Sequence, residues 1–311
     1  MRILIELPTW LGDSVMATPA IENLVDYTSD SKITLIGSLV AIEILKNHPK
    51  VIKTYVIDKA YINLYKTIKD FSEFDLFISF RGSFRSKFIN FFISAGLFYQ
   101  FDKNRYKQLH QVEKYNNFIN DSINIDSKPK KLLLYGDRSE KNNKTKLLGI
   151  NPGASYGSSK QWYPEEFAAV AKELSENYNI IIFGGLSEVS IAFDIEKILI
   201  REGIVNYENL AGKTSITDLI SRISILDLFI TGDTGPMHIA ASLDIPTVCL
   251  FGPTNHRETS QYNFSKSVIV KKNLNCQPCM KRKCPLNHHN CMKSIKAIDV
   301  INSLIELDLK K

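Results

Sequence analysis

The residues best suited to chemistry lie in a turn at 232–235, inside the stretch LDLFITGDTGPMHIAASLDIPTVCLFGPT (226–254). An apolar run precedes the turn, Pro236 stands where a helix would begin, and a second apolar run follows. This order predicts strand, turn, helix and strand, with free backbone N–H groups and the positive end of the helix dipole at the turn. Such a turn suits a phosphate, although a tight connection with a buried histidine is the alternative interpretation. The residues expected to shape the pocket are Asp233, Thr234, Gly235 and His238.

Asp13 is the second candidate. It ends the segment TWLGD (9–13), ahead of the apolar-periodic stretch SVMATPAIENLVDY (14–27), which predicts a helix. A carboxylate here can act as a general base toward a bound hydroxyl. It can equally cap the helix, because exposed amides and the helix dipole favour a negative charge at this point. The residues alone leave both interpretations open.

Three basic side chains follow an apolar run at 75–80, which predicts a buried strand. Ligands of parallel α/β sheets bind beyond the carboxyl ends of the strands. Guanidinium and ammonium groups at that position can bind phosphates or carboxylates. The candidates for an anionic acceptor are Arg81, Arg85 and Lys87.

A second polar loop, GINPGASYGSSKQWYP (149–164), lies between a predicted strand and a helix that begins near Pro164. The GxxxxGK[ST] pattern of a P-loop is absent, so this loop is not a P-loop. Further along, Glu188 ends the strand and turn NIIIFGGLSE (179–188). It could accept hydrogen bonds from ribose hydroxyls, or it could be a first-turn partner of the helix dipole. The candidate residues of the loop are Ser158, Ser159 and Lys160.

Strands and helices alternate along most of the chain, which predicts right-handed βαβ crossovers and parallel sheets covered on both faces. The periodicity lapses between 126 and 146, where we expect an edge strand at 131–135 and a linker. We therefore expect an α/β fold with two Rossmann-like domains, 1–146 and 147–311. The last periodic helix, 294–308, is expected to pack back toward the first domain. The other predicted strands are 2–8, 33–37 and 51–58, and the other predicted helices end near 47 and 69 or begin near 84.

Composition narrows the class of protein. The chain has 311 residues, 44% of them hydrophobic, and a net charge of +6, which is ordinary for a globular protein. Residues 81–146 hold 14 basic and 6 acidic side chains, so the positive excess lies there and favours anionic partners. No apolar run approaches the roughly 20 residues needed to span a bilayer. No signal peptide is evident either, so we expect a cytoplasmic protein.

Four of the five cysteines lie in CQPCMKRKCPLNHHNC (276–291). In a cytoplasmic chain, a CxxC followed by two more cysteines is a pattern for structural zinc. The spacing is compact for a zinc module, so free thiols remain the alternative. Cys249 falls inside a predicted buried strand and should be inert. The candidate zinc ligands are Cys276, Cys279, Cys284 and Cys291.

The segment DTGPMHIAASLDIPTVCLFGPT resembles the nucleotide-sugar site of glycosyltransferase family 9, the bacterial heptosyltransferases. The resemblance continues in LGD (11–13), in the lysine before an aromatic residue in SSKQW (158–162) and in the cysteine segment. It implies a GT-B fold, in which two Rossmann-like domains face each other across a cleft, with Asp13 as catalytic base and Lys160 on the donor's phosphate. One departure is that Tyr163 separates Trp162 from Pro164, where the family more often has Trp next to Pro.

The same resemblance implies an inverting transfer with ADP-L-glycero-D-manno-heptose as donor and a Kdo-linked heptosyl lipid A as acceptor, and more closely the enzymes that add the second inner-core heptose. No cofactor or catalytic metal is expected, and contact with the cytoplasmic face of the inner membrane would be transient. The alternatives are a first-heptose or other family 9 transferase, and a related nucleotide-sugar epimerase. A zinc-stabilised nucleic-acid binder is disfavoured because the half from 147 to 311 carries no net charge.

Overall fold

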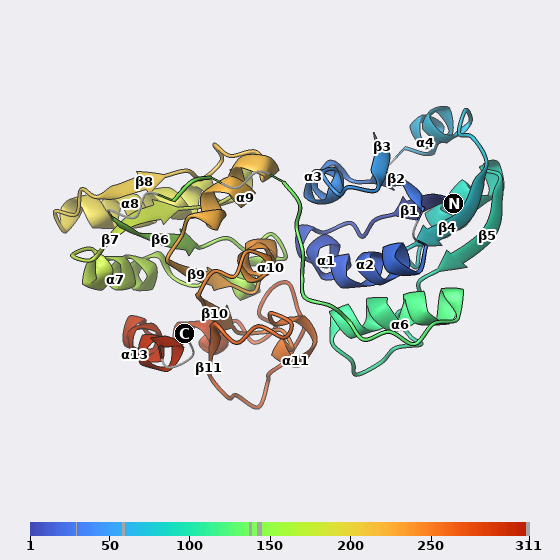
Figure 1. Ribbon diagram of the computed structural model, residues 1–311. Coiled ribbons are helices and arrows are strands. Elements are labelled where there is room, and N and C mark those ends of the chain that lie inside the picture. Colours follow the sequence, from blue (N-terminus) through green and yellow to red (C-terminus); the bar gives the residue numbers. More distant parts are fainter. Residues whose placement is uncertain (29, 58–59, 137–138, 142–144, 309–311) are drawn as a thin grey trace. The chain divides into compact units, whose positions relative to one another are not determined.

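The computed structural model describes residues 1–311 except 29, 58–59, 137–138, 142–144 and 309–311. The chain divides into two compact units, Met1–Gly136 and Asp137–Lys311 (Figure 1). The domain boundary expected from the sequence lies later, at 146, which is the first residue of a strand of the second unit. Each unit is built on one parallel sheet, so the expected α/β fold with two Rossmann-like sheets is confirmed.

The first unit holds a five-stranded parallel sheet in the order β3-β2-β1-β4-β5. The pairing register places Glu6, the last residue of β1, beside Ser79, the last residue of β4. The three central strands, β1, β2 and β4, are nearly continuous buried runs, as expected for a sheet covered on both faces. Polar side chains that end these strands therefore gather at one edge. The strands are β1 (Arg2–Glu6), β2 (Lys32–Gly37), β3 (Val51–Val56), β4 (Phe74–Ser79) and β5 (Ala95–Gln100).

Helices cover both faces of this sheet (Figure 1). On one face, Leu4, Ile36 and Phe77 pack in a core with residues of α4 and α5. Elsewhere α2 packs against α6, and α1 against α3. The helices are α1 (Leu11–Met16), α2 (Thr18–Tyr27), α3 (Leu39–Leu45), α4 (Tyr61–Ile68), α5 (Phe84–Phe92) and α6 (Gln111–Ile123).

The first unit corrects two expectations. The helix expected at 14–27 is two helices, because α1 begins at Leu11 and α2 begins at Thr18 with a proline in its first turn. The edge strand expected at 131–135 does not form. Instead the Leu133 N–H donates to Thr18 Oγ1 at 3.1 Å and the Tyr135 hydroxyl donates to Glu22. The segment therefore lies along α2, which supplies its hydrogen bonds. Strand β5 and helix α6 are additional elements that the sequence pattern did not predict.

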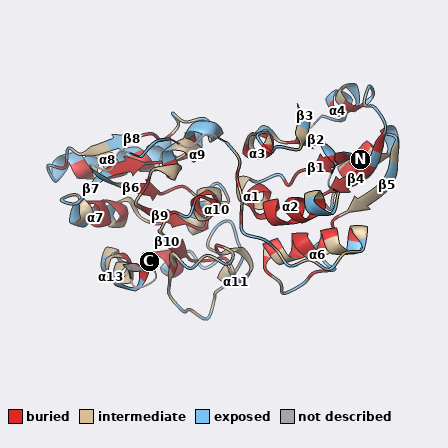
Figure 2. Cartoon of the chain, in the orientation of Figure 1, coloured by how far each residue is buried: buried red, intermediate tan, exposed pale blue. Residues whose placement is uncertain are grey.

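The second unit holds a six-stranded parallel sheet in the order β11-β10-β9-β6-β7-β8. Its central pair, β6 and β9, places Asn151 beside Thr231 at the carboxyl edge. Figure 2 shows buried residues running through the central strands. The strands are β6 (Lys146–Asn151), β7 (Tyr178–Ile182), β8 (Tyr207–Asn209), β9 (Leu228–Gly232), β10 (Thr247–Phe251) and β11 (Ser267–Lys271).

Local sequence explains where several helices of this unit begin. Pro164 stands at the start of α7, as expected, and Ser215 caps α9 by accepting from the Asp218 N–H at 3.1 Å. The final helix α13 contacts α7, β10 and β11 of its own unit, and the expected packing toward the first domain stays a prediction. The helices are α7 (Pro164–Leu174), α8 (Val189–Arg201), α9 (Ile216–Ser224), α10 (Gly235–Ser242), α11 (His256–Thr259), α12 (Asn290–Lys293) and α13 (Ala297–Asp308), with short 3₁₀ turns η1 (Ser158–Lys160) and η2 (Leu186–Glu188).

Within the part of the chain that the structure describes, no helix combines the length and apolar character needed to cross a bilayer.

Gly149, in the middle of β6, tests how tightly the second sheet is packed. A Cβ atom there would lie 2.5 Å from Leu226 Cδ1 and 2.7 Å from Phe229 Cδ2. Gly149→Ala should therefore cost about 1–3 kcal/mol of stability through overpacking. Thermal denaturation would show this as a lower Tm than that of Ala169→Ser, a change on the exposed side of α7. Equal melting temperatures would contradict this packing.

Candidate active site

The turn after β9 is fixed by side chains from two neighbouring strands. The Asn151 amide, at the end of β6, donates to Thr231 Oγ1 at 3.1 Å and to Thr234 Oγ1 at 3.0 Å. Thr234 is the N-cap residue of α10, and its side chain makes no cap hydrogen bond to that helix. Helix α10 therefore begins at the carboxyl edge, where a phosphate would meet the N–H of Gly235, whereas Pro236 has no N–H and the Met237 N–H donates to the Thr234 carbonyl oxygen at 3.2 Å. Asn151 and Thr231 were missed, and the available signal was a polar residue ending a buried strand.

Lys160 and Asp233 form a buried ion pair at this edge. Lys160 Nζ lies 2.5 Å from Asp233 Oδ2 and donates to the Asp233 carbonyl oxygen at 3.0 Å. The Lys160 and Asp233 side chains are only 12% and 6% exposed. The Thr254 hydroxyl, beyond β10, donates to the same carboxylate oxygen at 2.6 Å. The pair therefore joins the loop before α7 to the turns after β9 and β10.

The aromatic ring of Tyr156 adds a second anchor for this lysine. Lys160 Nζ lies 4.8 Å from the centre of the ring and Arg282 Cζ lies 5.6 Å from it. The Tyr156 hydroxyl donates to the Met280 carbonyl oxygen at 2.8 Å. Two cations on one ring concentrate positive charge beside the loop, which favours an anionic ligand. The sequence pattern did not single out Tyr156 or Arg282.

The other predicted donor residues occupy different environments. His238 is 3% exposed in the first turn of α10. Glu188 is 6% exposed, and its carboxylate accepts from the Gly185 N–H and from the Ser187 hydroxyl, each at 2.7 Å. Its side chain also lies against Gly153, where a Cβ would be 2.7 Å from Glu188 Cγ. Glu188 thus holds its own turn beside the loop after β6, and a ribose contact stays a prediction.

The two serines of the loop differ in what they contact. Ser158 is exposed, whereas Ser159 is buried and its hydroxyl donates to the Lys281 carbonyl oxygen at 2.5 Å. The ring of His289 lies 2.8 Å from the Ser159 carbonyl oxygen through Nε2. Ser159 therefore fixes the cysteine segment against the loop. Both serines line a groove of roughly 600 Å³ that also includes Tyr163, Cys284 and His289.

The four cysteines of segment 276–291 are free thiols in the structure. Among the described residues, no three histidine, cysteine or acidic side chains are placed to hold a metal ion. Backbone amides, chiefly that of His289, hold the pKa of Cys284 below its usual value, whereas burial raises that of Cys291 to about 11. Structural zinc here stays a prediction. Burial also raises the pKa of Cys249, so this thiol stays protonated, as expected.

In the first unit, Asp13 lies in the first turn of α1, whose N-cap is Trp10. The buried Tyr115 of α6 hydrogen-bonds the Asp13 carboxylate, and Gln111 hydrogen-bonds Tyr115. Burial first, and then the charge of Asp13, raise the pKa of Tyr115 well above its ordinary value, so the phenol remains a donor. Asp13 is therefore held by tertiary contacts with α6. Tyr115 comes from a helix that the sequence pattern did not predict.

The basic residues after β4 differ in their surroundings. Arg81 Nη1 lies 3.6 Å from Oε1 of Glu6, which is fully buried at the end of β1, and the Ser79 hydroxyl donates to Glu6 Oε2 at 2.7 Å. Arg81 therefore sits at the carboxyl edge with its charge partly compensated. Arg85 is half-buried in the first turn of α5, and Lys87 is exposed on the same helix. Glu6 escaped prediction because it ends an otherwise apolar strand.

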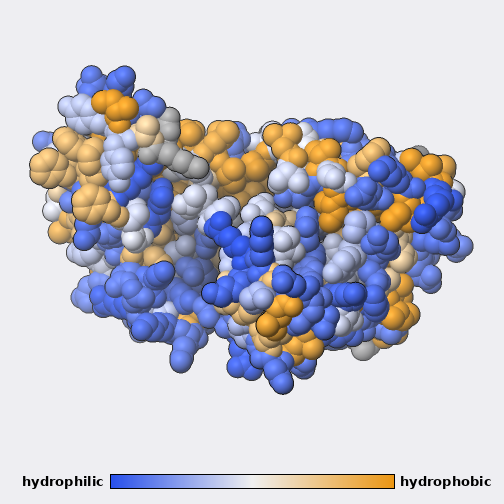
Figure 3. Space-filling model, turned by 180° about the vertical axis from the view of Figure 1, so that it is seen from behind, coloured by the Kyte–Doolittle hydropathy of each residue, from blue (hydrophilic) through white to orange (hydrophobic). Residues whose placement is uncertain are grey.

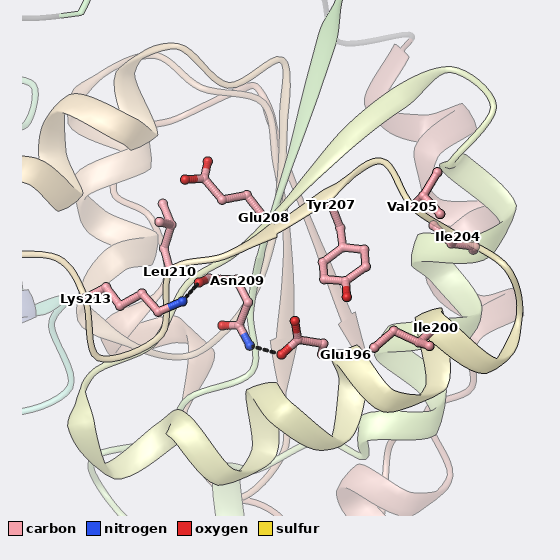
Figure 4. A pocket seen from close by; sticks show the side chains of 9 residues that line it. All are labelled: Glu196, Ile200, Ile204, Val205, Tyr207, Glu208, Asn209, Leu210 and Lys213. Atoms are coloured by element: carbon pink, nitrogen blue, oxygen red, sulfur yellow. Dashed lines mark hydrogen bonds between the residues drawn. The ribbon is translucent and has the colours of Figure 1, made fainter.

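A pocket at edge strand β8 lies apart from these residues in the chain (Figure 4). In it, the Asn209 amide donates to Glu196 Oε2 at 2.9 Å, and Lys213 Nζ donates to the Asn209 carbonyl oxygen at 2.8 Å. None of the predicted site residues lines it. Its polar groups are largely satisfied by one another, so we assign it no role in the chemistry.

Comparison with solved structures defines the class of protein. The chain matches the structure of E. coli ADP-heptose LPS heptosyltransferase II with a TM-score of 0.82, at 21% identity, over 100% of this chain and 99% of that one. It also matches a family 9 glycosyltransferase from Veillonella parvula with a TM-score of 0.83, at 20% identity, over 100% and 97%. These likenesses show the fold, and the predicted GT-B class is confirmed.

Sequence comparison then gives the family. The model of glycosyltransferase family 9 (heptosyltransferase) matches residues 63–290. Lipooligosaccharide heptosyltransferase 2 of Campylobacter jejuni serotype O:2 is 40% identical, over 97% of this chain and 96% of its own. The chain belongs to glycosyltransferase family 9, and the resemblance seen in its motifs is confirmed.

The Lys160–Asp233 pair predicts a characteristic pattern of stability. Lys160→Met leaves a buried carboxylate without its counter-charge, which should cost about 3–5 kcal/mol. The double variant Lys160→Met with Asp233→Asn removes both charges and should recover much of the lost Tm.

The matched control is Lys172→Met, because Lys172 pairs with Glu202 on the surface, where the side chains are 59% and 35% exposed. Its Tm should change little. A Lys160→Met variant as stable as this control, measured by thermal denaturation, would show that the buried pair does not hold the two loops together.

Proposed function

We propose that this chain is an inverting glycosyltransferase that moves L-glycero-D-manno-heptose from ADP-heptose to the first heptose of the lipopolysaccharide inner core. The observation that carries the proposal is the 40% identity, over nearly the full length of both chains, to lipooligosaccharide heptosyltransferase 2 of C. jejuni. The two carboxyl edges supply groups suited to each half of the reaction. In the first unit, Tyr115 holds the carboxylate of Asp13, which would serve as the base, and in the second unit Asp233 holds Lys160 near the start of α10.

In this proposal the second unit binds the donor. Lys160 and the first-turn amides of α10 would bind the diphosphate, and His238 would add a donor from the same helix. Asp233 holds Lys160 in place before the ligand arrives, since the two groups are 2.5 Å apart. The arriving diphosphate would share this lysine with Asp233. The remaining contacts are assigned to Thr234 and Gly235 at the turn, Ser158 and Ser159 in the loop, and Glu188 toward the ribose.

The first unit supplies the base and binds the acceptor. The acceptor hydroxyl oxygen attacks the anomeric carbon and its proton passes to Asp13, while the bond from that carbon to the diphosphate oxygen breaks and ADP leaves. A single displacement of this kind inverts the anomeric centre. Charge developing on the diphosphate is stabilised by Lys160 and the α10 amides. Arg81, Arg85 and Lys87 are proposed to bind phosphates or carboxylates of the acceptor.

We propose that catalysis needs no metal, because a lysine and helix amides can carry the leaving-group charge that Mg²⁺ carries in other transferases. Zinc at Cys276, Cys279, Cys284 and Cys291 would be structural, since Ser159 and His289 already tie this segment to the donor loop. We further infer cytoplasmic action with transient contact with the inner membrane, where the lipid-linked acceptor lies, and no nucleic-acid partner.

The direct test is to incubate the protein with ADP-heptose and lipopolysaccharide truncated after the first heptose, in the presence of EDTA. ADP release together with an acceptor heavier by one heptose supports the proposal. Turnover of the donor without an acceptor would instead indicate an epimerase. Transfer only to an acceptor ending in Kdo would indicate a first-heptose enzyme.

Asp13→Asn should lower kcat by roughly 100-fold or more, because the amide cannot accept the proton. Its affinity for ADP should change little, since the proposed donor residues belong to the other unit. Asp26→Asn is the matched control, because Asp26 is a largely exposed carboxylate on α2 that pairs with Lys130. Steady-state kinetics and ADP titration check both. A kcat for Asp13→Asn within a few-fold of wild type would rule out this base.

In the wild type, the hydrogen bond from Tyr115 stabilises the charged form of the Asp13 carboxylate. Tyr115→Phe removes this bond and should therefore raise the pKa of Asp13. Activity that needs ionised Asp13 is lost as pH falls through that pKa. The acid limb of the kcat/KM profile should therefore move to higher pH. Tyr106→Phe, which removes a hydroxyl bonded to Asp121 at 2.7 Å, is the control and should leave the limb in place. An unmoved limb in Tyr115→Phe would show that the tyrosine serves only packing.

A further inference from the structure

The first unit carries an unusual concentration of exposed apolar side chains on two neighbouring helices. On α5, Phe84 and Phe91 are 78% and 81% exposed, and on α4, Ile62 is 62% exposed. Three large apolar side chains this open on adjacent helices are costly in water unless something covers them. The α4–α5 aromatic face, as we name it, consists of Tyr61, Ile62, Tyr65, Phe84, Phe88, Phe91 and Phe92.

Aromatic rings of the two helices contact one another across this face. The ring centres of Tyr61 and Phe88 are 4.9 Å apart, and those of Tyr65 and Phe92 are 5.0 Å apart. Beneath them, Leu64, Ile68 and Ile89 are buried in the core of the unit, so the rings rest on a fixed support. Figure 3 shows hydrophobic side chains among hydrophilic ones on the part of the first unit where α4 lies, at the upper left when seen from behind. The face is therefore built into the fold.

Charge on the same helices has a single sign. The 8 residues of α4 and the 9 of α5 include Lys66, Arg85 and Lys87 and no acidic side chain. Phenylalanine, isoleucine and tyrosine side chains next to lysine and arginine form the composition that binds the interface of an anionic bilayer. In proteins with this composition, the rings enter the headgroup region and the cations contact lipid phosphates.

We propose that the α4–α5 aromatic face docks on a bilayer that contains anionic phospholipid. The proposal rests on the proposed function, because an acceptor held in a membrane gives the docking its purpose. A second copy of the chain fits less well. An isologous dimer through this face would bring the three cations of one copy against the same three of its partner.

The test uses the full chain and flotation with vesicles of phosphatidylethanolamine and phosphatidylglycerol. Wild type should float with these vesicles, less so at high salt, and should not float with phosphatidylcholine vesicles. The double variant Phe84→Ser with Phe91→Ser should bind about tenfold or more weakly, because two apolar anchors are lost. Lys66→Glu should also weaken binding. Phe193→Ser, a 50% exposed position on α8 of the second unit, is the control and should bind like wild type.

Absence of wild-type flotation, or equal flotation of the double variant, would overturn the proposal. The proposal would also be overturned if light scattering showed that the wild type is a dimer and the double variant a monomer, because the face would then pair two copies of the chain. Transfer to an acceptor freed of its acyl chains separates this proposal from the function. If transfer fails while flotation persists, the proposed function is wrong and the docking proposal stands. If transfer persists without flotation, the docking proposal is wrong and the proposed function stands.

Discussion

The buried pair between Lys160 and Asp233 is the contact on which the second unit's site depends. Its nitrogen and oxygen are 2.5 Å apart, and Thr254 adds a hydrogen bond to the same carboxylate. Three segments that follow different strands are thereby held at one point. Leaving either charge buried without its partner would cost free energy, so the pair favours keeping the two loops together. The lysine is thus placed, and its geometry fixed, before any anion arrives.

The two units share this arrangement. In the first, the buried carboxylate of Glu6 ends β1 and lies 3.6 Å from Arg81 after β4. In the second, Asp233 follows β9 and binds Lys160 from the loop after β6. In each case a carboxylate at the carboxyl edge holds a cation beside the region where ligands of parallel sheets bind. The first unit also holds the carboxylate of Asp13 through Tyr115, so this unit combines a fixed cation with a fixed carboxylate.

Sequence pattern was sufficient to predict the turns and helix ends that depend on neighbouring residues alone. The GDTG turn, the helix start at Pro164 and the Ser215 cap follow from strand ends, proline and serine at their usual positions. The partners of the site residues could not be found this way. Asn151 and Glu6 are polar residues that end apolar strands, which marks them as candidates but does not say what they contact, and Thr254 and Tyr115 act across the fold. The segment 131–135 gave a wrong prediction because an apolar segment can be buried without forming a strand: Leu132 and Leu134 are buried, and the Leu133 N–H donates to Thr18 of α2.

The most direct test of the account is calorimetric titration of the protein with ADP, AMP and adenosine. If Lys160, His238 and the α10 amides bind the diphosphate, each phosphate removed should weaken binding by about tenfold or more, because hydrogen bonds to a charged group contribute about 1.5–3 kcal/mol. ADP should then bind most tightly and adenosine most weakly. Equal dissociation constants for the three ligands would contradict a diphosphate site at the carboxyl edge of the second sheet.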